Sequence, residues 1–599
     1  MKESRKIERR SRYDRYAPDF PWYEPGRPIR DLKDMITSSA ELFAERPCIW
    51  VKKFKGAEYK AINYKMFKQD MDALAVKMMD MGLKGKRIAV LGVGCYEWII
   101  TYMATVCGVG VIVPIDKELD SESIQNLLRA AECDILFFSS SEVKKIDKIE
   151  GLSLAVKMEL YGDRISEDES FAYEEDGKYI PWKKLVKEGH ELIAAGSPLY
   201  QEYLDVEIDP EVMNMLLFTS GTTGNPKGVM LCHRNMVANC IQLAEHEEIL
   251  PDDVTLSVLP MHHTYETMAT VMFLYRGASI AHSEGLKYIT KNMQEIRNTF
   301  FIAVPLLVET VYDKIWKTAK KQGKDKLLRK VINLNRKTKR VGMDLSGVLL
   351  KSVREQLGGR LRAVVTGASA VAPEIVRGFS DFGINIVQGY GLTETSPVVA
   401  AVPMFVDQAY KDRKAGSTGV CVKGGEFKID EPNEDGIGEI LYKGPNVMLG
   451  YYNMPEETAK TFDGEWFKTG DMGFLDPEGW LYITGRAKNI IVTPTGENIY
   501  PEEIEEVVNR NPFIKDSMIY PLKKNGVETV AVQLFPNVEE FEFEYGRVPE
   551  KEEMEDIMKG IIREINGTLP TYKIIRTVIV RDEDFVRTTT KKIKRTANI

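Results

Sequence analysis

One loop concentrates side chains that could bind a phosphate. Residues 218–228 read Phe-Thr-Ser-Gly-Thr-Thr-Gly-Asn-Pro-Lys-Gly and follow the mostly apolar run 213–217. Glycine lets a backbone approach a ligand closely, and hydroxyl and ammonium groups donate hydrogen bonds to phosphate oxygens. It is not a Walker P-loop, because Pro226 and Gly228 stand where that motif needs Gly and Ser or Thr. The composition predicts a phosphate cradle after a strand, although a flexible polar loop would have a similar composition.

Two further stretches follow strand-like runs. Residues 388–395 read Gln-Gly-Tyr-Gly-Leu-Thr-Glu-Thr, and residues 366–373 read Thr-Gly-Ala-Ser-Ala-Val-Ala-Pro. Ligands of open parallel sheets bind at the carboxyl ends of the strands. The aromatic ring, hydroxyls and carboxylate of the first stretch suit base stacking, phosphate contact and magnesium binding, and the small residues of the second admit a flat ring. Taken alone, a turn with an incidental tyrosine explains the first stretch about as well, and tight packing against a helix is the favoured explanation of the second.

Three more stretches hold candidate groups. Asp471 ends the run Trp-Phe-Lys-Thr-Gly-Asp, and Arg486 follows fifteen positions later. A carboxylate can accept hydrogen bonds from both hydroxyls of a ribose. Residues 588–595 read Thr-Thr-Thr-Lys-Lys-Ile-Lys-Arg, which alone would more often be a solvated basic tail. Residues 259–266, Leu-Pro-Met-His-His-Thr-Tyr-Glu, follow a further strand-like run.

Taken in their order, these motifs resemble those of the adenylate-forming superfamily, which contains acyl-CoA synthetases, luciferases and peptide-synthetase adenylation domains. The resemblance extends from about Asp31 to the C-terminus. It includes residues 488–504, which resemble the hinge between the large and small domains of that family. Each motif alone is weak to moderate evidence, whereas their combination in the family's order is specific.

The resemblance assigns most of these residues to ATP and Mg²⁺. Tyr390 would stack on the base, Thr393 would contact phosphate, and Glu394 would bind the metal. Asp471 would hold the ribose, with Arg486 nearby on the ribose or phosphate. The other implied nucleotide contacts are Thr219, Ser220, Gly221, Thr222, Thr223, Gly224, Lys227, Gly367, Ala368, Ser369, Gln388, Gly389 and Gly391.

The resemblance also implies catalytic and hinge residues. Lys592 matches the lysine that reaches the substrate carboxylate and the α-phosphate. Lys591 stands where relatives carry glycine, so Lys591 remains the alternative for this role. Lys488 would be the pivot of the hinge, and Gly496 would lie against the pantetheine arm of coenzyme A. His263 would occupy the gate of the acyl pocket.

The implied reaction has two halves. A carboxylate attacks the α-phosphate of ATP to give an acyl-adenylate and pyrophosphate, and the thiol of coenzyme A then displaces AMP. The resemblance is strongest to long-chain fatty acyl-CoA synthetases, so we expect a medium- to long-chain fatty acid as substrate. Thr264 stands where amino-acid-activating relatives carry aspartate, which argues against an amino acid. An acyl-carrier-protein ligase, an aryl-acid ligase and a catalytically decayed lipid- or nucleotide-binding relative remain alternatives.

The elements that must position these groups alternate between strand and helix, which predicts an α/β fold with parallel βαβ sheets. We expect strands at 87–94, 110–114, 134–139, 254–260, 301–305, 361–366 and 384–388, and helices at 96–106 and 121–131. Residues 317–357 are predicted to form a basic helical insertion on the surface.

The pattern of expected secondary structure changes towards the C-terminus. Short strands between turns at 414–484 predict a small barrel-like subdomain. We therefore expect an N-terminal arm at 1–30, a large domain at 31–486 and a small, mobile α+β domain at 487–599. In the small domain we expect helices at 500–509 and 550–566, strands at 529–535 and 577–581, and an acidic solvated loop at 538–544.

Composition limits the class of protein. The 599 residues exceed what one core holds, and the net charge of −8 argues against nucleic acid as the main partner. The seven scattered cysteines contain no CxxC pair, which favours reduced, mostly buried thiols in a cytoplasmic protein. No signal peptide is visible, and glycines and a proline split the uncharged run 98–115 into helix, turn and strand rather than a membrane span. A peripheral membrane contact through the lipid substrate is a further expectation, although the basic start of the chain is better explained as a solvated arm.

Overall fold

The computed structural model describes residues 15, 20–24, 26–151, 154–158, 177–219, 226–339, 343–367, 371–492, 497–524, 527–587 and 593–599. Within it the chain forms two compact units. Unit 1 comprises residues 1–426, 443–467 and 477–480, and unit 2 comprises residues 427–442, 468–476 and 481–599. The predicted arm, most of which lies outside the described residues, and the predicted division after residue 486 stay predictions.

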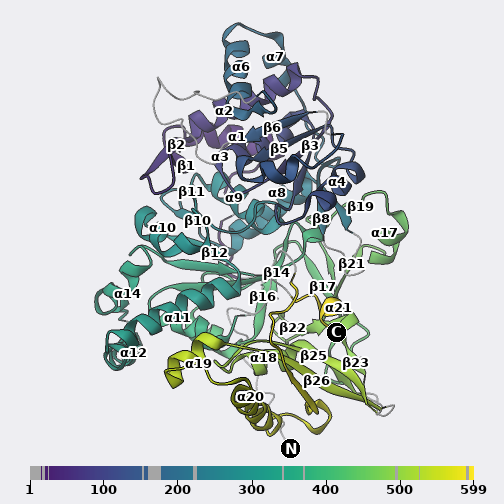
Figure 1. The fold of residues 1–599 in the computed structure, drawn as a ribbon. Coiled ribbons are helices and arrows are strands. Elements are labelled where there is room, and N and C mark those ends of the chain that lie inside the picture. Colours follow the sequence, from purple (N-terminus) through teal and green to yellow (C-terminus); the bar gives the residue numbers. More distant parts are fainter. Residues whose placement is uncertain are drawn as a thin grey trace, which may run out of the picture. The chain divides into compact units, whose positions relative to one another are not determined.

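The first sheet of unit 1 is mainly parallel (Figure 1). Its central strands are short apolar runs buried on both faces, as is typical of parallel sheets flanked by helices. The helices of this region are α1 (Leu32–Leu42), α2 (Tyr64–Asp80), α3 (Tyr96–Ala104), α4 (Ser121–Ala130), α5 (Val143–Ile146), α6 (Trp182–Ala194), α7 (Pro198–Leu204) and α8 (His233–His246). The strand order is β19 (Gly450–Tyr451), β9 (Lys227–Cys232), β8 (Met213–Thr219), β4 (Val111–Ile115), β3 (Arg87–Leu91), β5 (Ile135–Ser139), β6 (Ala155–Met158) and β7 (Ile180–Pro181).

The second run of strands in unit 1 carries the other motifs. The pairings β10–β12, β12–β13 and β13–β14 are parallel, whereas β15 adds antiparallel to β14. The strand order is β16 (Ser417–Cys421), β15 (Val398–Ala401), β14 (Asn385–Gly391), β13 (Ala363–Thr366), β12 (Phe300–Ala303), β10 (Val254–Ser257), β11 (Ser279–His282), β1 (Pro47–Lys52) and β2 (Tyr59–Asn63). The predicted α/β class and the predicted parallel strands are therefore confirmed, with ends that differ by a few residues.

The predicted basic insertion at 317–357 is helical, as expected. Apolar residues of α11 and α12, among them Ile315 and Ile332, are buried in a core cluster that also contains residues of the second sheet. Proline at the first turn starts α11 and α15, where its fixed φ and missing N–H cost nothing. The helices of this half are α9 (Thr264–Arg276), α10 (Ile289–Ile296), α11 (Pro305–Lys321), α12 (Asp325–Lys339), α13 (Ser346–Leu349), α14 (Lys351–Gln356), α15 (Pro373–Asp381), α16 (Gln408–Arg413) and α17 (Pro455–Thr461).

Most of unit 2 is built on antiparallel strands. The strands β17 (Glu426–Asp430), β18 (Gly438–Lys443), β21 (Trp466–Leu475) and β22 (Trp480–Arg486) follow one another in an open order, so the described strands of the predicted barrel-like subdomain close no barrel. A three-stranded sheet of β25 (Ile514–Lys524), β26 (Val527–Pro536) and β27 (Thr577–Val580) packs with α18 (Pro501–Asn509) and α20 (Lys551–Asn566). Strand β25 was not among the predicted elements.

The acidic segment predicted as a solvated loop at 538–544 is instead helix α19 (Val538–Tyr545). Phe541 is fully buried in the core of unit 2, and its ring centroid lies 4.7 Å from that of Phe513. The prediction was wrong because the glutamates outweighed the apolar spacing of Val538, Phe541 and Tyr545, which marks one helix face.

Two expectations about the chain as a whole can be compared with the described residues. Residues 98–115 form the end of α3, a π-helical turn (Thr105–Val109) and β4, as predicted. Among the described helices, none combines the length and apolar character needed to cross a membrane. The seven cysteines are free thiols, and all but Cys133 are buried.

Candidate functional site

Three motifs of unit 1 meet at the carboxyl end of β13 and β14. Thr366 of β13 is the register partner of Gln388 of β14. A Cβ on Gly367 would lie 3.2 Å from the carbonyl oxygen of Gly389 and 3.7 Å from Cζ of Tyr265. The parallel register and the contacts of Gly367 therefore bring Thr366 and Gly367 close to Gln388, Gly389 and Tyr265, which belong to motifs far apart in the sequence.

The turn after β14 is fixed by hydrogen bonds that leave Glu394 at its centre. A Cβ on Gly391 would lie 1.9 Å from the carbonyl oxygen of Pro397, so only glycine fits there. The 3₁₀ helix η4 (Thr393–Thr395) follows, and the hydroxyl of Thr395 accepts from the backbone N–H of Leu392 at 3.1 Å. The amide of Asn446 donates to the carbonyl of Thr395 at 2.7 Å. The position of Glu394 is thus set by backbone contacts on both sides of it.

Tyr451 connects Glu394 to the predicted phosphate loop. Its hydroxyl donates to Oε1 of Glu394 at 2.9 Å, and Nζ of Lys227 lies 4.9 Å from the centroid of its ring. Burial, and then the negative charge of Glu394, raises the pKa of Tyr451, so the hydroxyl stays a neutral donor. Tyr451 belongs to β19, which pairs with β9 of the loop's hairpin. Sequence reasoning missed Tyr451, because no spacing links it to either motif.

Lys227 has a carboxylate partner that sequence reasoning also missed. Its Nζ lies 2.9 Å from Oε2 of Glu457, the third residue of α17. The ammonium groups of Lys460 and Lys227 lower the pKa of Glu457 to about 2. Thr219 faces Lys227 across the hairpin, and its hydroxyl donates to the carbonyl of Lys227 at 3.4 Å. Lys227 is therefore held by an ion pair with Glu457 at the end of the hairpin that carries the loop.

His263 stands at the N-cap of α9, where the predicted acyl-pocket motif begins its helix. Its ring centroid lies 4.0 Å from that of His262, and burial lowers the pKa of His262 to about 4, so His262 is neutral near pH 7. Burial also raises the pKa of Glu266, in the first turn of the same helix, to about 7. The start of α9 therefore places the neutral His262 and the buried Glu266 close to His263.

In unit 2, Asp471 and Arg486 are cross-strand partners on β21 and β22. Nε of Arg486 lies 2.7 Å from Oδ1 of Asp471. The hydroxyl of Thr469 accepts from the backbone N–H of Asp471 at 3.1 Å. Asp471 is only 4% exposed, whereas the side chain of Arg486 is 39% exposed. The two residues, which were predicted to lie near each other, thus form a direct ion pair.

Lys488 follows this pair in a 3₁₀ turn, η5 (Ala487–Asn489). Burial, and then the positive charges of Arg486 and Arg595, lowers the pKa of Lys488. Several predicted site residues lie outside the described residues, so their contacts are not part of this description: Ser220, Gly221, Thr222, Thr223, Gly224, Ala368, Ser369, Gly496, Lys592 and its alternative Lys591.

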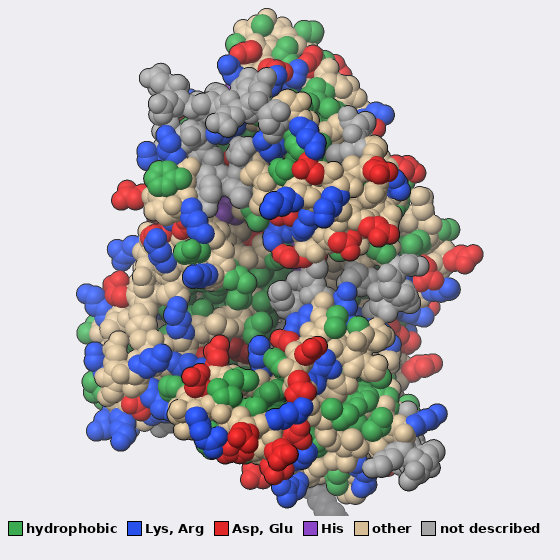
Figure 2. Space-filling model, viewed as in Figure 1, with side chains coloured by type: hydrophobic (Ala, Val, Ile, Leu, Met, Phe, Trp, Pro, Cys, Tyr) green, Lys and Arg blue, Asp and Glu red, His purple; other side chains and the backbone are tan. Residues whose placement is uncertain are grey.

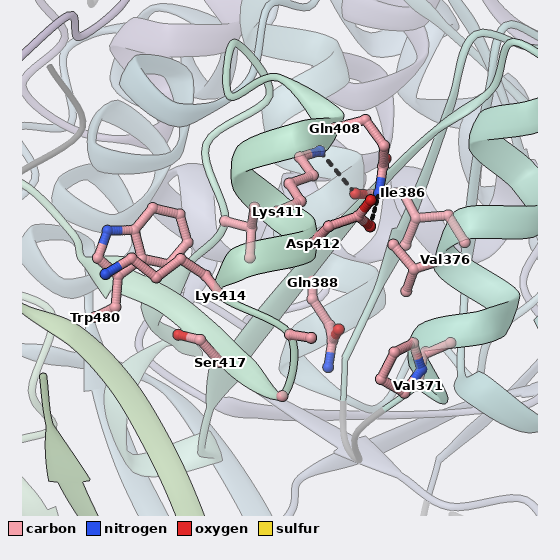
Figure 3. A pocket seen from close by; sticks show the side chains of 14 residues that line it. Val371, Val376, Ile386, Gln388, Gln408, Lys411, Asp412, Lys414, Ser417 and Trp480 are labelled. Atoms are coloured by element: carbon pink, nitrogen blue, oxygen red, sulfur yellow. Dashed lines mark hydrogen bonds between the residues drawn. The ribbon is translucent and has the colours of Figure 1, made fainter. Parts of the chain in front are cut away.

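A small pocket lies beside β14, and Figure 3 shows Gln388, Val371 and Lys411 around it. Its volume of about 40 Å³ suits a few water molecules and is too small for a nucleotide. Lys411 donates to the carbonyl of Ile386 at 3.0 Å, and burial lowers its pKa to about 7. This lysine ties α16 to β14, the strand that carries Gln388.

Comparison with known proteins gives a family and its relatives. A family model described as AMP-binding enzyme matches residues 36–452. Long-chain-fatty-acid–CoA ligase 1 of Cavia porcellus is 27% identical over 521 residues, which are 82% of this chain and 72% of that protein. The peroxisomal long chain acyl-CoA synthetase 7 of Arabidopsis thaliana is 28% identical over 547 residues, which are 87% of this chain and 75% of that protein.

Solved structures share the fold. The anthranilate CoA ligase AuaEII in complex with anthranoyl-AMP has a TM-score of 0.72 and 17% identity, and the match covers 96% of this chain and 98% of that one. O-succinylbenzoate coenzyme A synthetase (MenE) from Bacillus subtilis, in complex with ATP and magnesium, has a TM-score of 0.69 and 21% identity, covering 94% and 98%. At these identities the likeness concerns the fold alone.

Proposed function

This chain belongs to the AMP-binding enzyme family, and we propose that it is a fatty acyl-CoA ligase. In the proposed reaction a medium- to long-chain fatty acid and ATP give an acyl-adenylate and pyrophosphate, and coenzyme A then takes the acyl group and releases AMP. The observation that carries the nucleotide half is the hydrogen bond between Tyr451 and Glu394, with Lys227 against the same tyrosine ring. Tyr451 links Glu394, the carboxylate proposed to bind the metal, to Lys227, the lysine proposed to bind phosphate.

The choice of a fatty acid rests on relatives. The curated relatives at 27–28% identity bear the names of long-chain fatty acid ligases over most of this chain. Solved structures of similar fold include an anthranilate ligase and an O-succinylbenzoate ligase, whose acids are aromatic. An aryl acid is therefore the competing substrate class, and the experiment below distinguishes the two.

The residues of this chain fit a magnesium–ATP complex. Glu394 is oriented by a neutral hydroxyl, so its negative charge is available to a divalent cation, which would screen the phosphates. Lys227, Thr219 and the hydroxyls of the loop would hold the β- and γ-phosphates. Lys227 would exchange Glu457 for phosphate, since an ammonium group donates hydrogen bonds to either anion.

The remaining contacts of the proposal divide between base, ribose and reacting centre. Tyr390 and the backbone of Gly367 and Gly389 would bound the adenine. Asp471 would accept from the ribose hydroxyls, with Arg486 orienting it. The other members of these sets are Thr393 on phosphate, and Ala368, Ser369, Gln388 and Gly391 around the base.

The proposal gives the reacting centre to Lys592, with Lys591 as the alternative. Two anions, a carboxylate and a phosphate, must meet there, so a cation lowers the barrier more than an acid or base would. Lys488 would be the pivot that withdraws this lysine after adenylation and presents Gly496 to coenzyme A. His263 would line the entrance of the acyl pocket.

The test is pyrophosphate exchange over a panel of fatty and aromatic acids, followed by thioester formation with coenzyme A or an acyl-carrier protein. We expect exchange to be fastest with medium- to long-chain fatty acids and thioester to form on coenzyme A. Faster exchange with an aromatic acid would reassign the substrate class, and transfer to the carrier protein alone would reassign the acceptor. Nucleotide binding without exchange for any acid would indicate a catalytically decayed relative.

A further inference from the structure

The helical hairpin of α11 and α12 is strongly basic in an acidic protein. Residues 314–339 contain eleven lysines and arginines and one aspartate, whereas the whole chain carries a net charge of −8. Figure 2 shows Lys and Arg side chains gathered over these helices, at the lower left of the view. Placing so many like charges on one hairpin costs free energy through mutual repulsion, which favours a role for the charge itself.

The inward face of the hairpin packs against the rest of unit 1. Ile315 and Ile332 are buried in the core cluster of the second sheet. Arg336 makes a two-point ion pair with Asp381 of α15, at 2.7 and 2.6 Å, and Arg329 stacks over the ring of Trp316 at 4.7 Å. These contacts use the basic residues at the flanks of α12 and fix which side of the helix faces solvent.

The outward side of α12 combines lysine with leucine. Lys326, Lys330 and Lys337 lie at the spacing of one helix face, and all three are exposed. No residue in the described part of the chain forms a hydrogen bond or an ion pair with their side chains. Leu327 and Leu334, two turns apart at the edge of the same side, are 60% and 50% exposed. We call these five residues the α12 face.

The α12 face matches the chemistry of an anionic membrane surface. Lysines attract lipid phosphates, and leucines beside them can enter the boundary between headgroups and acyl chains. A nucleic acid would use the lysines and leave the leucines exposed, and the net negative charge of the chain opposes it. We propose that the α12 face is a docking surface for membranes that contain anionic lipids. This inference goes beyond the proposed function and is tested without turnover.

The test measures binding of the full-length protein to vesicles of phosphatidylcholine with or without phosphatidylglycerol, at low and high salt. We expect binding only to the anionic vesicles and weakening by salt. A lysine near such a surface contributes about 1 kcal/mol, so the variant K326E/K330E/K337E should bind at least roughly 100-fold more weakly. L327S/L334S should weaken binding several-fold while keeping the charge and the salt dependence.

The matched control is K144E/K148E/K187E, which changes three other exposed lysines of unit 1 by the same charge. It should bind the anionic vesicles nearly as the unaltered protein does, and all variants should keep the thermal unfolding of the parent. Equal loss in both triple variants, or no binding of the parent at low salt, would overturn the proposal. A different partner would also overturn the proposal. This would be the result if the parent bound an acidic protein or an RNA instead of the vesicles, and if only K326E/K330E/K337E lost that binding.

Discussion

Two carboxylates, one in each unit, are held in opposite ways. Glu394 of unit 1 accepts a hydrogen bond from the neutral hydroxyl of Tyr451, whereas Asp471 of unit 2 pairs with the guanidinium of Arg486. A hydroxyl orients a carboxylate without neutralising its charge, whereas a guanidinium both orients the carboxylate and neutralises its charge. The difference teaches that Glu394 is suited to a cation and Asp471 to a neutral ligand, such as the hydroxyls of a ribose.

The surroundings of the two carboxylates follow the same division. Glu394 is half-buried on a short 3₁₀ turn, and its partner Tyr451 lies against Lys227 of the loop proposed to bind phosphate. Asp471 is nearly fully buried in the middle of a strand, and its partner strand carries Arg486 directly opposite. A strand holds a side chain more precisely than a turn does, which suits the two-point contact with ribose hydroxyls proposed for Asp471.

Removing the charge of Glu394 is expected to have the largest effect. Glu394→Gln keeps the size of the side chain and loses the metal-binding charge, so adenylation should fall about 10³-fold. The measurement is pyrophosphate exchange over a range of magnesium concentrations. Exchange at the parent rate, with an unchanged response to magnesium, would show that Glu394 does not bind the metal. The proposed difference between Glu394 and Asp471 would then be wrong.

Lys592→Ala tests whether unit 2 supplies the reacting centre as well as the ribose contact. We expect adenylation to fall roughly 10²- to 10³-fold, because the variant lacks the cation between two anions. Transfer of the acyl group from supplied acyl-adenylate to coenzyme A should stay nearly normal. Lys591→Ala is the matched control, and a larger loss in that variant would move the role to Lys591.

Asp471→Asn should cost less than Glu394→Gln and act on the nucleotide rather than on the metal. The amide still accepts one hydrogen bond, but the charge-assisted contact is lost, so kcat/KM for ATP should fall about 10- to 100-fold. The response to magnesium should not change. The measurement compares ATP with 2′-deoxy-ATP. A variant that still prefers ATP as strongly as the parent would show that Asp471 does not contact the ribose.

Tyr451→Phe removes the neutral donor without changing any charge. Since a hydrogen bond to a charged group contributes about 1.5 kcal/mol or somewhat more, adenylation should fall roughly tenfold and need more magnesium. Tyr452→Phe is the control, because its hydroxyl lies 3.5 Å from Glu132, away from Glu394. Equal effects of the two substitutions would mean that the hydroxyl of Tyr451 does not orient Glu394.

The smallest expected difference concerns stability. All six histidines of the sequence lie in unit 1, and burial lowers the pKa of His233, His246, His262 and His282 to about 4. These histidines are neutral when folded but bind protons below about pH 6.5 when unfolded, so their contribution is present above that pH and is lost as the pH falls towards 4.

Burial raises the pKa of Glu247 and Glu266 in unit 1 and of Glu505 in unit 2 to about 7, so these carboxyls bind protons more readily in the folded state and oppose part of the loss. Because the four histidines outnumber the two glutamates in unit 1, mild acid should still lower the stability of unit 1 more than that of unit 2. At about pH 5.5 each buried histidine lowers the free energy of unfolding by about 1 kcal/mol. Calorimetry at neutral and mildly acidic pH measures this as a drop in the melting temperature of unit 1. A larger drop in unit 2, which has no histidine, would contradict the assignment.

Much of the arrangement of unit 1 was predictable because it rests on local patterns. The buried runs at 87–91 and 135–139, the alternating helices and the stretches after β13 and β14 are all visible in short windows of sequence. The prediction of α19 was wrong because its acidic composition and its apolar spacing pointed to different structures. Strand β25 was not predicted, because it is stabilised by its long pairing with β26.

The sequence by itself determined which side chains are available: the lysine and hydroxyls of the loop, Glu394, Asp471 and Arg486. Only the tertiary structure decided how each is held, because those partners are long-range. Tyr451 is 57 positions from Glu394, and Glu457 is 230 positions from Lys227. Strand register also placed Arg486 opposite Asp471. Hydrogen bonds and ion pairs of this kind depend on chain segments meeting in space, a property that no local pattern of residues encodes.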